Sequence, residues 1–219
     1  MTERTVAFLG GGKMGEALIS GLIRSGGRTP EEIMVTCRRD ERARELGGKY
    51  GIAATLDNAE AARWAHTLVL MAKPQDMETM LSQIRAHVTT DDLVISFAAG
   101  IRTSFVEKHL PEDIPVVRVM SNVPVMVDEA MSVVAAGRHA SDEHLGMAEE
   151  LLGYVGKVLR LKESHLDADS LRAGIERCLH PLLSRTSRRK HAFKIPVLTS
   201  SPRRHDRGTS SPYGLRCRC

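Results

Sequence analysis

Three glycines near the start of the chain have the spacing of a nucleotide-binding loop. Gly10, Gly12 and Gly15 lie in the segment FLGGGKMGEAL, which follows an apolar run and precedes a helical pattern. In a G-x-G-x-x-G loop the first glycine makes the tight turn, the second lets a pyrophosphate approach the backbone, and the third lets the helix pack on the sheet. The helix N-terminus adds free N–H groups. The segment therefore predicts a dinucleotide site, with a plain glycine turn as the alternative.

The end of the next apolar run, VTCRRDE, indicates which dinucleotide. A site for NAD usually carries an acidic residue there, which binds the ribose 2′-hydroxyl. Here Thr36, Arg38 and Arg39 come first, and no acidic residue precedes Asp40. Arginines suit a 2′-phosphate, and Thr36 adds a hydroxyl donor. We predict NADP(H) as the cofactor; NAD(H) is the alternative, in which both arginines only face solvent.

The elements that must hold this loop alternate regularly up to about residue 165. Short β-branched runs predict strands at 5–10, 32–37, 67–72, 92–98, 116–120, 131–137 and 157–162. Helical patterns lie between several of them, at 13–26, 41–51, 75–88 and 142–156. Strands that are apolar on both faces and separated by helices are typical of a parallel sheet. We therefore predict an α/β fold with a Rossmann-like, doubly wound parallel sheet.

The chain changes character after about residue 168. Residues 171–219 carry twelve basic and two acidic side chains, a net charge of +10, so the preceding part carries −6 of the total +4. This last segment is rich in Arg, Ser and Pro and has no sustained helical or alternating period. We predict a dinucleotide-binding domain over 1–168 and a basic tail of low order over 169–219.

Composition also argues against several classes of function. No apolar run reaches the roughly 18 residues that span a bilayer, so we expect no membrane partner and a cytoplasmic protein. The spacing of the four cysteines predicts neither a zinc site nor a disulfide framework, and we expect no metal. The basic tail could attract nucleic acid through charge, but only Phe193 and Tyr213 could stack on bases, so we expect no specific nucleic-acid partner.

Five segments in order resemble pyrroline-5-carboxylate reductase, and together they span about residues 4–168. The segments are FLGGGKMGEAL, VLMAKPQDM, ISFAAGI, RVMSNVPVMVDEAMSVV and VGKVLRLKESHLDA. The resemblance implies NADPH-dependent reduction of a small-molecule substrate, 1-pyrroline-5-carboxylate, to proline, the last step of proline biosynthesis.

The resemblance also implies roles for single residues. The implied cofactor contacts are Leu9, Gly10, Gly11, Gly12, Lys13 and Met14 at the pyrophosphate, Asn58 at the adenosine ribose, Met71, Ala72, Lys73 and Pro74 at the nicotinamide ribose, and Phe97, Ala98 and Ala99 at the nicotinamide. Asn122 would stand close to the reacting centre. Plainer roles are the alternatives: a solvated Lys73, an Asn122 that caps a turn, and Met71 and Phe97 as core residues only. No side-chain nucleophile is implied, so the catalytic residues stay unassigned.

The chain also departs from the family pattern. Ser121, Val123 and Ala130 replace the usual Pro, Thr and Gly. Beyond Ala168 the family's Ser-Gly-Ser-Gly-Pro segment and helical dimerisation domain are not recognisable, a truncation that a reading-frame slip would explain. We therefore expect the family's homo-oligomer to be lost. Two functions follow: a reductase, or an NADP(H)-binding remnant without turnover.

Overall fold

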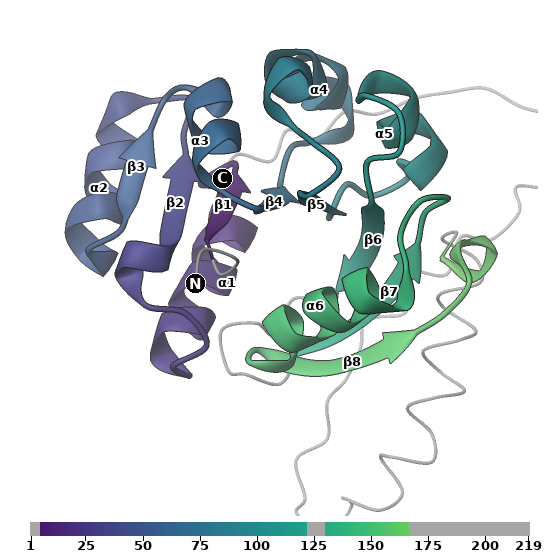
Figure 1. The fold of residues 1–219 in the computed structure, drawn as a ribbon. Coiled ribbons are helices and arrows are strands. Elements are labelled where there is room, and N and C mark those ends of the chain that lie inside the picture. Colours follow the sequence, from purple (N-terminus) through teal and green to yellow (C-terminus); the bar gives the residue numbers. More distant parts are fainter. Residues whose placement is uncertain (1–4, 122–129, 167–219) are drawn as a thin grey trace, which may run out of the picture. The chain divides into compact units, whose positions relative to one another are not determined.

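The computed structural model describes residues 5–121 and 130–166. The chain divides into two units, Met1–Leu179 and His180–Cys219, and every described residue lies in the first. Eight strands form one sheet in the order β3-β2-β1-β4-β5-β6-β7-β8, with helices on both faces (Figure 1). The predicted Rossmann-like α/β class is confirmed, whereas the predicted domain boundary at 168 lies outside the described residues.

The elements follow the predicted alternation of strands and helices. The strands are β1 (Val6–Leu9), β2 (Ile33–Thr36), β3 (Ala53–Thr55), β4 (Thr67–Leu70), β5 (Leu93–Ser96), β6 (Val116–Ser121), β7 (Ala130–Ala136) and β8 (Gly156–Arg160). The α-helices are α1 (Lys13–Arg24), α2 (Asp40–Tyr50), α3 (Asn58–Trp64), α4 (Met77–Ile84), α5 (Thr103–His109) and α6 (Asp142–Gly153). Short 3₁₀ helices lie at η1 (Pro30–Glu32), η2 (Pro74–Asp76), η3 (Arg85–His87) and η5 (Glu163–His165).

The sheet is parallel except where β6 meets β7. The strands from β3 to β6 pair in parallel, and β8 runs parallel to β7. β6 and β7 pair antiparallel, with Met120 opposite Val133. Only eight residues separate these two strands, and a parallel crossover needs a dozen or more. The short connection accounts for the change of direction, which the expectation of a wholly parallel sheet did not include.

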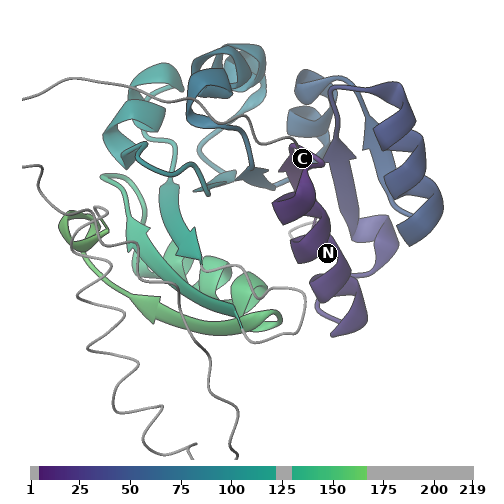
Figure 2. The same ribbon diagram turned by 180° about the vertical axis from the view of Figure 1, so that it is seen from behind.

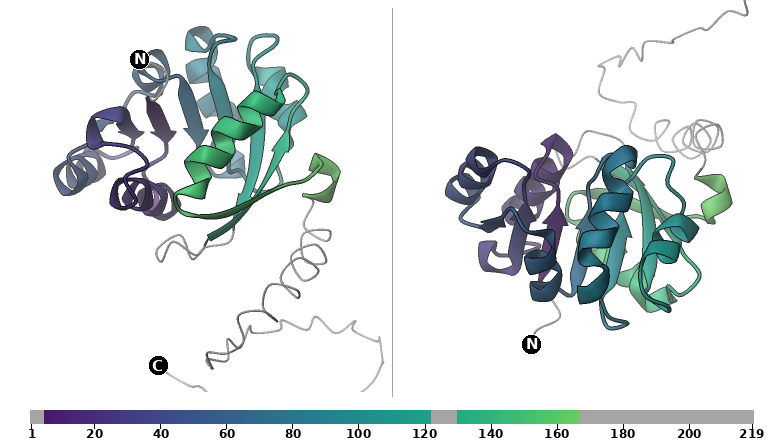
Figure 3. Two further views of the ribbon diagram at one scale, coloured as in Figure 1. Left: turned by 60° about the horizontal axis from the view of Figure 1, so that its bottom comes forward. Right: turned by 90° about the horizontal axis from the view of Figure 1, so that it is seen from above.

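The core forms two layers because the central strands bury side chains on both faces. Along β1, Val6 and Phe8 pack with α1, α2 and α6, while Ala7 and Leu9 pack with α3, α4 and α5. Views from behind and from two further directions show these helix groups on opposite sides of the sheet (Figures 2 and 3). This two-sided cover holds the carboxyl ends of β1, β2, β4 and β5 at one edge, where ligands bind in open α/β sheets.

β3 and α3 are among the elements that were not predicted from the sequence. β3 has only three residues, none fully buried, and so lacks an apolar run. α3 buries only Ala61 and Ala62, and its start is fixed by Asp57, whose carboxylate accepts a hydrogen bond from the Ala59 N–H at 2.8 Å. Both elements depend on neighbours, β2 and α4, more than on their own pattern.

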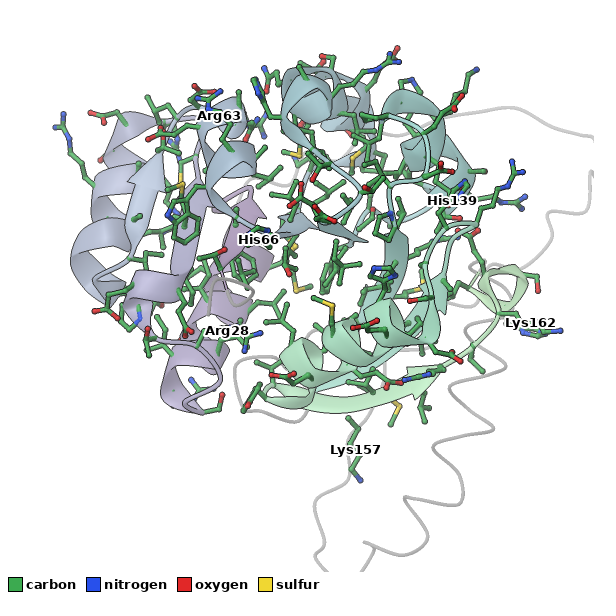
Figure 4. The ribbon with its side chains drawn as sticks, in the orientation of Figure 1. Arg28, Arg63, His66, His139, Lys157 and Lys162 are labelled. Atoms are coloured by element: carbon green, nitrogen blue, oxygen red, sulfur yellow. The ribbon has the colours of Figure 1, made fainter. Side chains whose placement is uncertain are left out.

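The loop after α1 ties the first βα unit to α6. A Cβ on Gly27 would lie 2.5 Å from the Tyr154 ring, so the backbone there packs directly on the aromatic side chain. Arg28 is buried beside this contact, and its guanidinium lies 3.6 Å from the Glu150 carboxylate (Figure 4). The contact fixes the end of the sheet opposite the glycine loop.

Within the described ranges, no helix is both long and apolar enough to cross a membrane.

Candidate functional site

The glycine loop turns sharply from β1 into α1 and leaves one glycine facing open space. Gly10 has φ of +127°, a conformation that L residues avoid, and a Cβ there would lie 3.1 Å from the Met71 carbonyl oxygen. A Cβ on Gly15 would collide with the Gly10 carbonyl oxygen, so α1 packs against the loop backbone. Gly12 has nothing within 4 Å of its Cβ position. The loop is therefore closely packed at two glycines and accessible at the third.

The accessible glycine is also the N-cap of α1. Gly12 has an extended backbone, and no side chain within the described residues caps the helix at this point. The N–H groups of the first helical turn are those that a helix leaves without intrahelical partners. Together with the positive end of the helix dipole they favour an anion. The loop thus combines open space with donors for a pyrophosphate.

A cleft of about 470 Å³ opens beside this loop, at the carboxyl ends of β2 and β4. Seven of the predicted cofactor residues line it: Gly12, Thr36, Arg38, Asn58, Met71, Ala72 and Lys73. Six further residues also line it, and the sequence analysis did not single them out: Cys37, Leu56, Asp76, Thr79, Met80 and Gln83. The cleft gathers residues from four segments that are separated in the sequence.

A smaller hollow of about 200 Å³ continues from the cleft around the end of β2. It is lined by Gly11, Gly12, Cys37, Arg38, Arg39 and Arg42. Arg38, Arg39 and the backbone of the glycine loop border this space, so its charge and size suit a phosphate. The hollow lies where a 2′-phosphate was predicted, and Arg42 is an additional arginine of the second βα unit.

Arg38 is available to solvent but already has an acidic neighbour. Its side chain is 81% exposed, and its guanidinium lies 3.3 Å from the Asp76 carboxylate across the cleft. Asp76 is the last residue of η2, which follows the predicted nicotinamide-ribose segment. A phosphate entering here would compete with this carboxylate for the same guanidinium.

Arg42 makes its hydrogen bonds to the glycine loop and to neighbouring carboxylates rather than to solvent. Its Nε donates to the Gly11 carbonyl oxygen at 2.9 Å, and its remaining nitrogens meet Glu16 at 2.5 Å and Glu45 at 2.7 Å. Glu16 also accepts hydrogen bonds from Lys49 at 2.8 Å and from a tyrosine of α2. The Lys49 and Arg42 side chains lower the pKa of Glu16 to about 2. This network binds α1, α2 and the loop into one unit.

Cys37 lines both the cleft and the smaller hollow. Its side chain is buried, and a Cβ on Gly11 would lie only 2.5 Å from its sulfur. Burial raises the pKa of the Cys37 thiol. The residue therefore acts as a small apolar spacer between the glycine loop and the end of β2.

The segments predicted to border the nicotinamide follow β4 and β5. Met71 contacts Gly10, and the Phe97 N–H donates to the Leu70 carbonyl oxygen at 3.0 Å. Ala98 is buried, whereas Ala99 is exposed. These two loop segments therefore emerge side by side from neighbouring strands, next to the glycine loop.

The remaining predicted residues lie around the cleft or outside it. Leu9 is buried at the end of β1, and Pro74 begins η2. Lys13 and Met14 line a separate hollow of about 450 Å³ beside Glu16 and Tyr50. Asn122 lies outside the described residues. Among the described residues, the cleft thus gathers more of those predicted at the pyrophosphate and the riboses than of those predicted at the nicotinamide ring.

Two features of the cleft had weak sequence signals. Asn58 is the first residue of α3, and its amide donates to the Gln83 side chain at 2.7 Å, which links α3 to α4. Leu56 is 54% exposed and is the one large apolar side chain so exposed among the described residues. An apolar residue between Thr55 and Asp57 could have been noticed, but its neighbours across the cleft depend on the fold.

Comparison with known proteins shows which family this chain resembles. Residues 5–100 match the family model described as NADP oxidoreductase, coenzyme F420-dependent. The pyrroline-5-carboxylate reductase of Corynebacterium melassecola is 40% identical over 173 residues, which cover 78% of this chain and 64% of that protein. The reductase of the same name from Methanosarcina acetivorans is 39% identical over 168 residues, 77% of this chain and 62% of that protein.

The resemblance to pyrroline-5-carboxylate reductase is confirmed. A solved reductase of this kind from Coxiella burnetii superposes with a TM-score of 0.70 at 26% identity, and the match covers 85% of this chain and 72% of that one. A Plasmodium falciparum pyrroline carboxylate reductase, solved with NADP bound, has a TM-score of 0.68 at 20% identity, covers 85% and 68% of the two chains, and supports the fold. The predicted NADP(H) cofactor agrees with the description of the family model. The chain spans less than two thirds of the length of these curated pyrroline-5-carboxylate reductases.

Proposed function

We propose that the described domain binds NADP(H) at the junction of β1 and α1. We propose further that the chain uses this cofactor to reduce 1-pyrroline-5-carboxylate to proline. One observation carries the cofactor part of the proposal. Gly12 faces open space at the start of α1, directly beside a hollow lined by Arg38, Arg39 and Arg42. A phosphorylated dinucleotide presents a pyrophosphate and a 2′-phosphate, and the loop and the hollow offer one fitting environment for each.

The residues present fit the other parts of this cofactor as well. The cleft adds polar groups for a ribose from Thr36 and Asn58, and an apolar wall for a base from Leu56 and Met80. Met71 and Phe97 then extend the wall toward the nicotinamide side. The order of these groups along the edge of the sheet, from β2 across β1 to β4 and β5, matches the order of parts in an extended dinucleotide.

This reaction requires the protein mainly to position the cofactor and the substrate. Bound NADPH would supply a hydride to the carbon of the ring's C=N bond, whose nitrogen already carries a proton in the iminium form. The segments after β4 and β5 would hold the two rings close together and exclude water from them. No nucleophilic side chain is needed for this reaction, and we assign none.

A second candidate is NADP(H) binding without turnover. The residues that support cofactor binding lie in the described part of the chain, whereas Asn122, the residue implied to stand near the substrate, lies outside it. The curated relatives also extend well beyond the matched region. Binding and turnover are therefore separate questions for this chain.

Two measurements on the purified full chain separate the candidates. Titration with NADPH, followed by its fluorescence, should saturate for the wild-type chain and not for Gly12→Ala, in which a methyl group occupies the space above the loop. Loss of NADPH absorbance on adding 1-pyrroline-5-carboxylate, with formation of proline, supports the reductase. Saturable binding with no oxidation supports binding without turnover. No binding by the wild-type chain would overturn both.

A further inference from the structure

Glu163 joins two segments that lie far from it in the sequence. Its Oε1 accepts a hydrogen bond from the Thr103 backbone N–H at 2.7 Å, and its Oε2 accepts one from the Thr103 hydroxyl at 2.8 Å. Arg118 Nη1 lies 3.4 Å from the same Oε1. Glu163 itself begins η5, directly after Lys162, which Figure 4 labels beyond the end of β8. One carboxylate therefore links the segment after β8 to α5 and to β6.

The two partners of Glu163 are buried, so their polar groups need partners within the protein. Arg118 is 2% exposed and Thr103 is 4% exposed. A buried guanidinium is costly unless its charge is paired, and a buried N–H at a helix start is costly unless it is bonded. The residue before Thr103, at the N-cap of α5, provides no side-chain cap. Glu163 supplies the missing acceptor from sixty residues away, and its negative charge also suits the start of a helix.

This contact lies next to the segment proposed to border the nicotinamide. Arg118 on β6 is in register with Ser96, the last residue of β5. The six residues 97–102 connect that point to Thr103. They are fixed at their start by the hydrogen bond from Phe97 to Leu70, and they include Gly100 in a left-handed conformation with φ of +74°. At their other end, the next residue, Thr103, is held by its two hydrogen bonds to Glu163. The short segment is thus held from both sides, and one side depends on a single carboxylate.

We propose that Glu163 is a positioning residue for the nicotinamide half of the bound cofactor, acting through Thr103 and Arg118 on the segment 97–102. This inference rests on the proposed function. The adenosine half would bind at β2 and the glycine loop, and β4 separates that region from β5 in the sheet. Loss of the Glu163 carboxylate should therefore loosen one end of the site and leave the other end intact.

The test compares two ligands on one variant of the full chain. Glu163→Gln keeps the size of the side chain but replaces one acceptor oxygen with an NH₂ group that cannot accept from Thr103. 2′,5′-ADP carries both phosphates of the adenosine half and has no nicotinamide. We expect NADPH to bind about five- to tenfold more weakly to Glu163→Gln, the loss of about one charge-assisted hydrogen bond, while 2′,5′-ADP binds within about twofold of wild type. The fluorescence emission of bound NADPH should also shift toward that of the free cofactor.

Two further variants keep the test decisive. Glu112→Gln makes the same change of charge on an exposed side chain and should leave both affinities unchanged. Thr103→Val removes the hydroxyl but keeps the backbone N–H, so it should weaken NADPH binding by a smaller factor than Glu163→Gln. It replaces Glu163→Gln in the test if that variant fails to fold. Equal weakening of both ligands would mean a general structural role and would overturn the inference, as would no change in NADPH binding. Failure of wild type to bind either ligand would instead overturn the proposed function, and this inference with it.

Discussion

Arg42 holds the carbonyl of Gly11, with its Nε donating at a distance of 2.9 Å. A residue of the second βα unit therefore fixes the glycine loop of the first. The same guanidinium meets Glu16 on α1 at 2.5 Å and Glu45 on α2 at 2.7 Å. Because the planar guanidinium uses donors in three directions at once, the loop backbone is fixed before any ligand arrives. Preorganisation of this kind reduces the cost of binding.

Arg42→Lys should weaken this preorganisation while keeping the charge. An ammonium group cannot reproduce the fork of donors, so we expect the free energy of unfolding to fall by about 1–3 kcal/mol and NADPH affinity to fall by about five- to tenfold. Arg44→Lys on the same helix is the control, because Arg44 is 81% exposed and pairs only at the surface with Asp40. Urea unfolding and NADPH titration of both variants check the prediction. Similar effects of the two substitutions would contradict it.

Gly12→Ala and Gly15→Ala should separate ligand binding from folding. Gly12 has φ of −75° and open space around its Cβ position, so alanine fits the folded chain and its melting temperature should stay within about 2 °C of wild type. The added methyl group occupies the space proposed for the pyrophosphate, and NADPH affinity should fall more than about tenfold.

Gly15→Ala should show the opposite balance. Its Cβ would collide with the Gly10 carbonyl oxygen, which is backbone and cannot rotate away. Overpacking of this kind destabilises by about 1–3 kcal/mol. Thermal unfolding of both variants distinguishes the two glycines, and a Gly12→Ala variant that is as destabilised as Gly15→Ala would contradict the assignment of open space.

Asp76→Asn should strengthen the preference for NADPH over NADH. Asp76 lies 3.3 Å from Arg38, so it competes with a phosphate for the guanidinium and also repels the phosphate. Without that charge we expect NADPH to bind about two- to fivefold more tightly, while NADH changes little. Arg38→Ala should shift the ratio of the two dissociation constants the other way. An unchanged ratio in both variants would mean that the phosphate does not reach Arg38.

Acid should remove the contribution of Glu16 to stability. Its folded-state pKa of about 2 lies below the ordinary value of 4.5, so its carboxylate stabilises the folded chain fully above about pH 4.5, and this contribution is lost as the pH falls through 2. We expect Glu16→Gln to cost about 1–2 kcal/mol near neutral pH, after allowance for solvent screening, and progressively less below pH 4.5. Unfolding by urea at several pH values measures this difference. A difference that does not change with pH would contradict the role of the charge.

The strong local signals of the sequence predicted the main elements. β1, β2, β4 and β5 are short apolar runs buried on both faces, and α1 follows its glycine loop with apolar residues at helical spacing, so period and composition suffice. β3 and α3 lack both signals, because β3 has three partly exposed residues and α3 buries two alanines. Their positions depend on pairing with β2 and packing against α4, which no local pattern contains.

The candidate site divides in the same way. Gly12 follows β1 and Arg38 follows β2 in one βαβ unit, so their places in the sequence suffice to predict their roles. Asp76 and Gln83 enter the cleft from another segment, and only the fold brings them there. The contact of Glu163 is even harder to predict from the sequence, since its partner Thr103 lies sixty residues earlier in the chain. Long-range partners of loop residues are the part of a site that a single sequence does not specify.

Calorimetric titration of the purified full chain with NADPH tests the central claim most directly. We predict saturable heat from one site per chain for wild type, and heat reduced to the level of dilution for Gly12→Ala, although that variant unfolds at nearly the wild-type temperature. Absence of binding heat for a folded wild-type chain, or equal affinity of wild type and Gly12→Ala, would contradict the proposal that the glycine loop binds the cofactor.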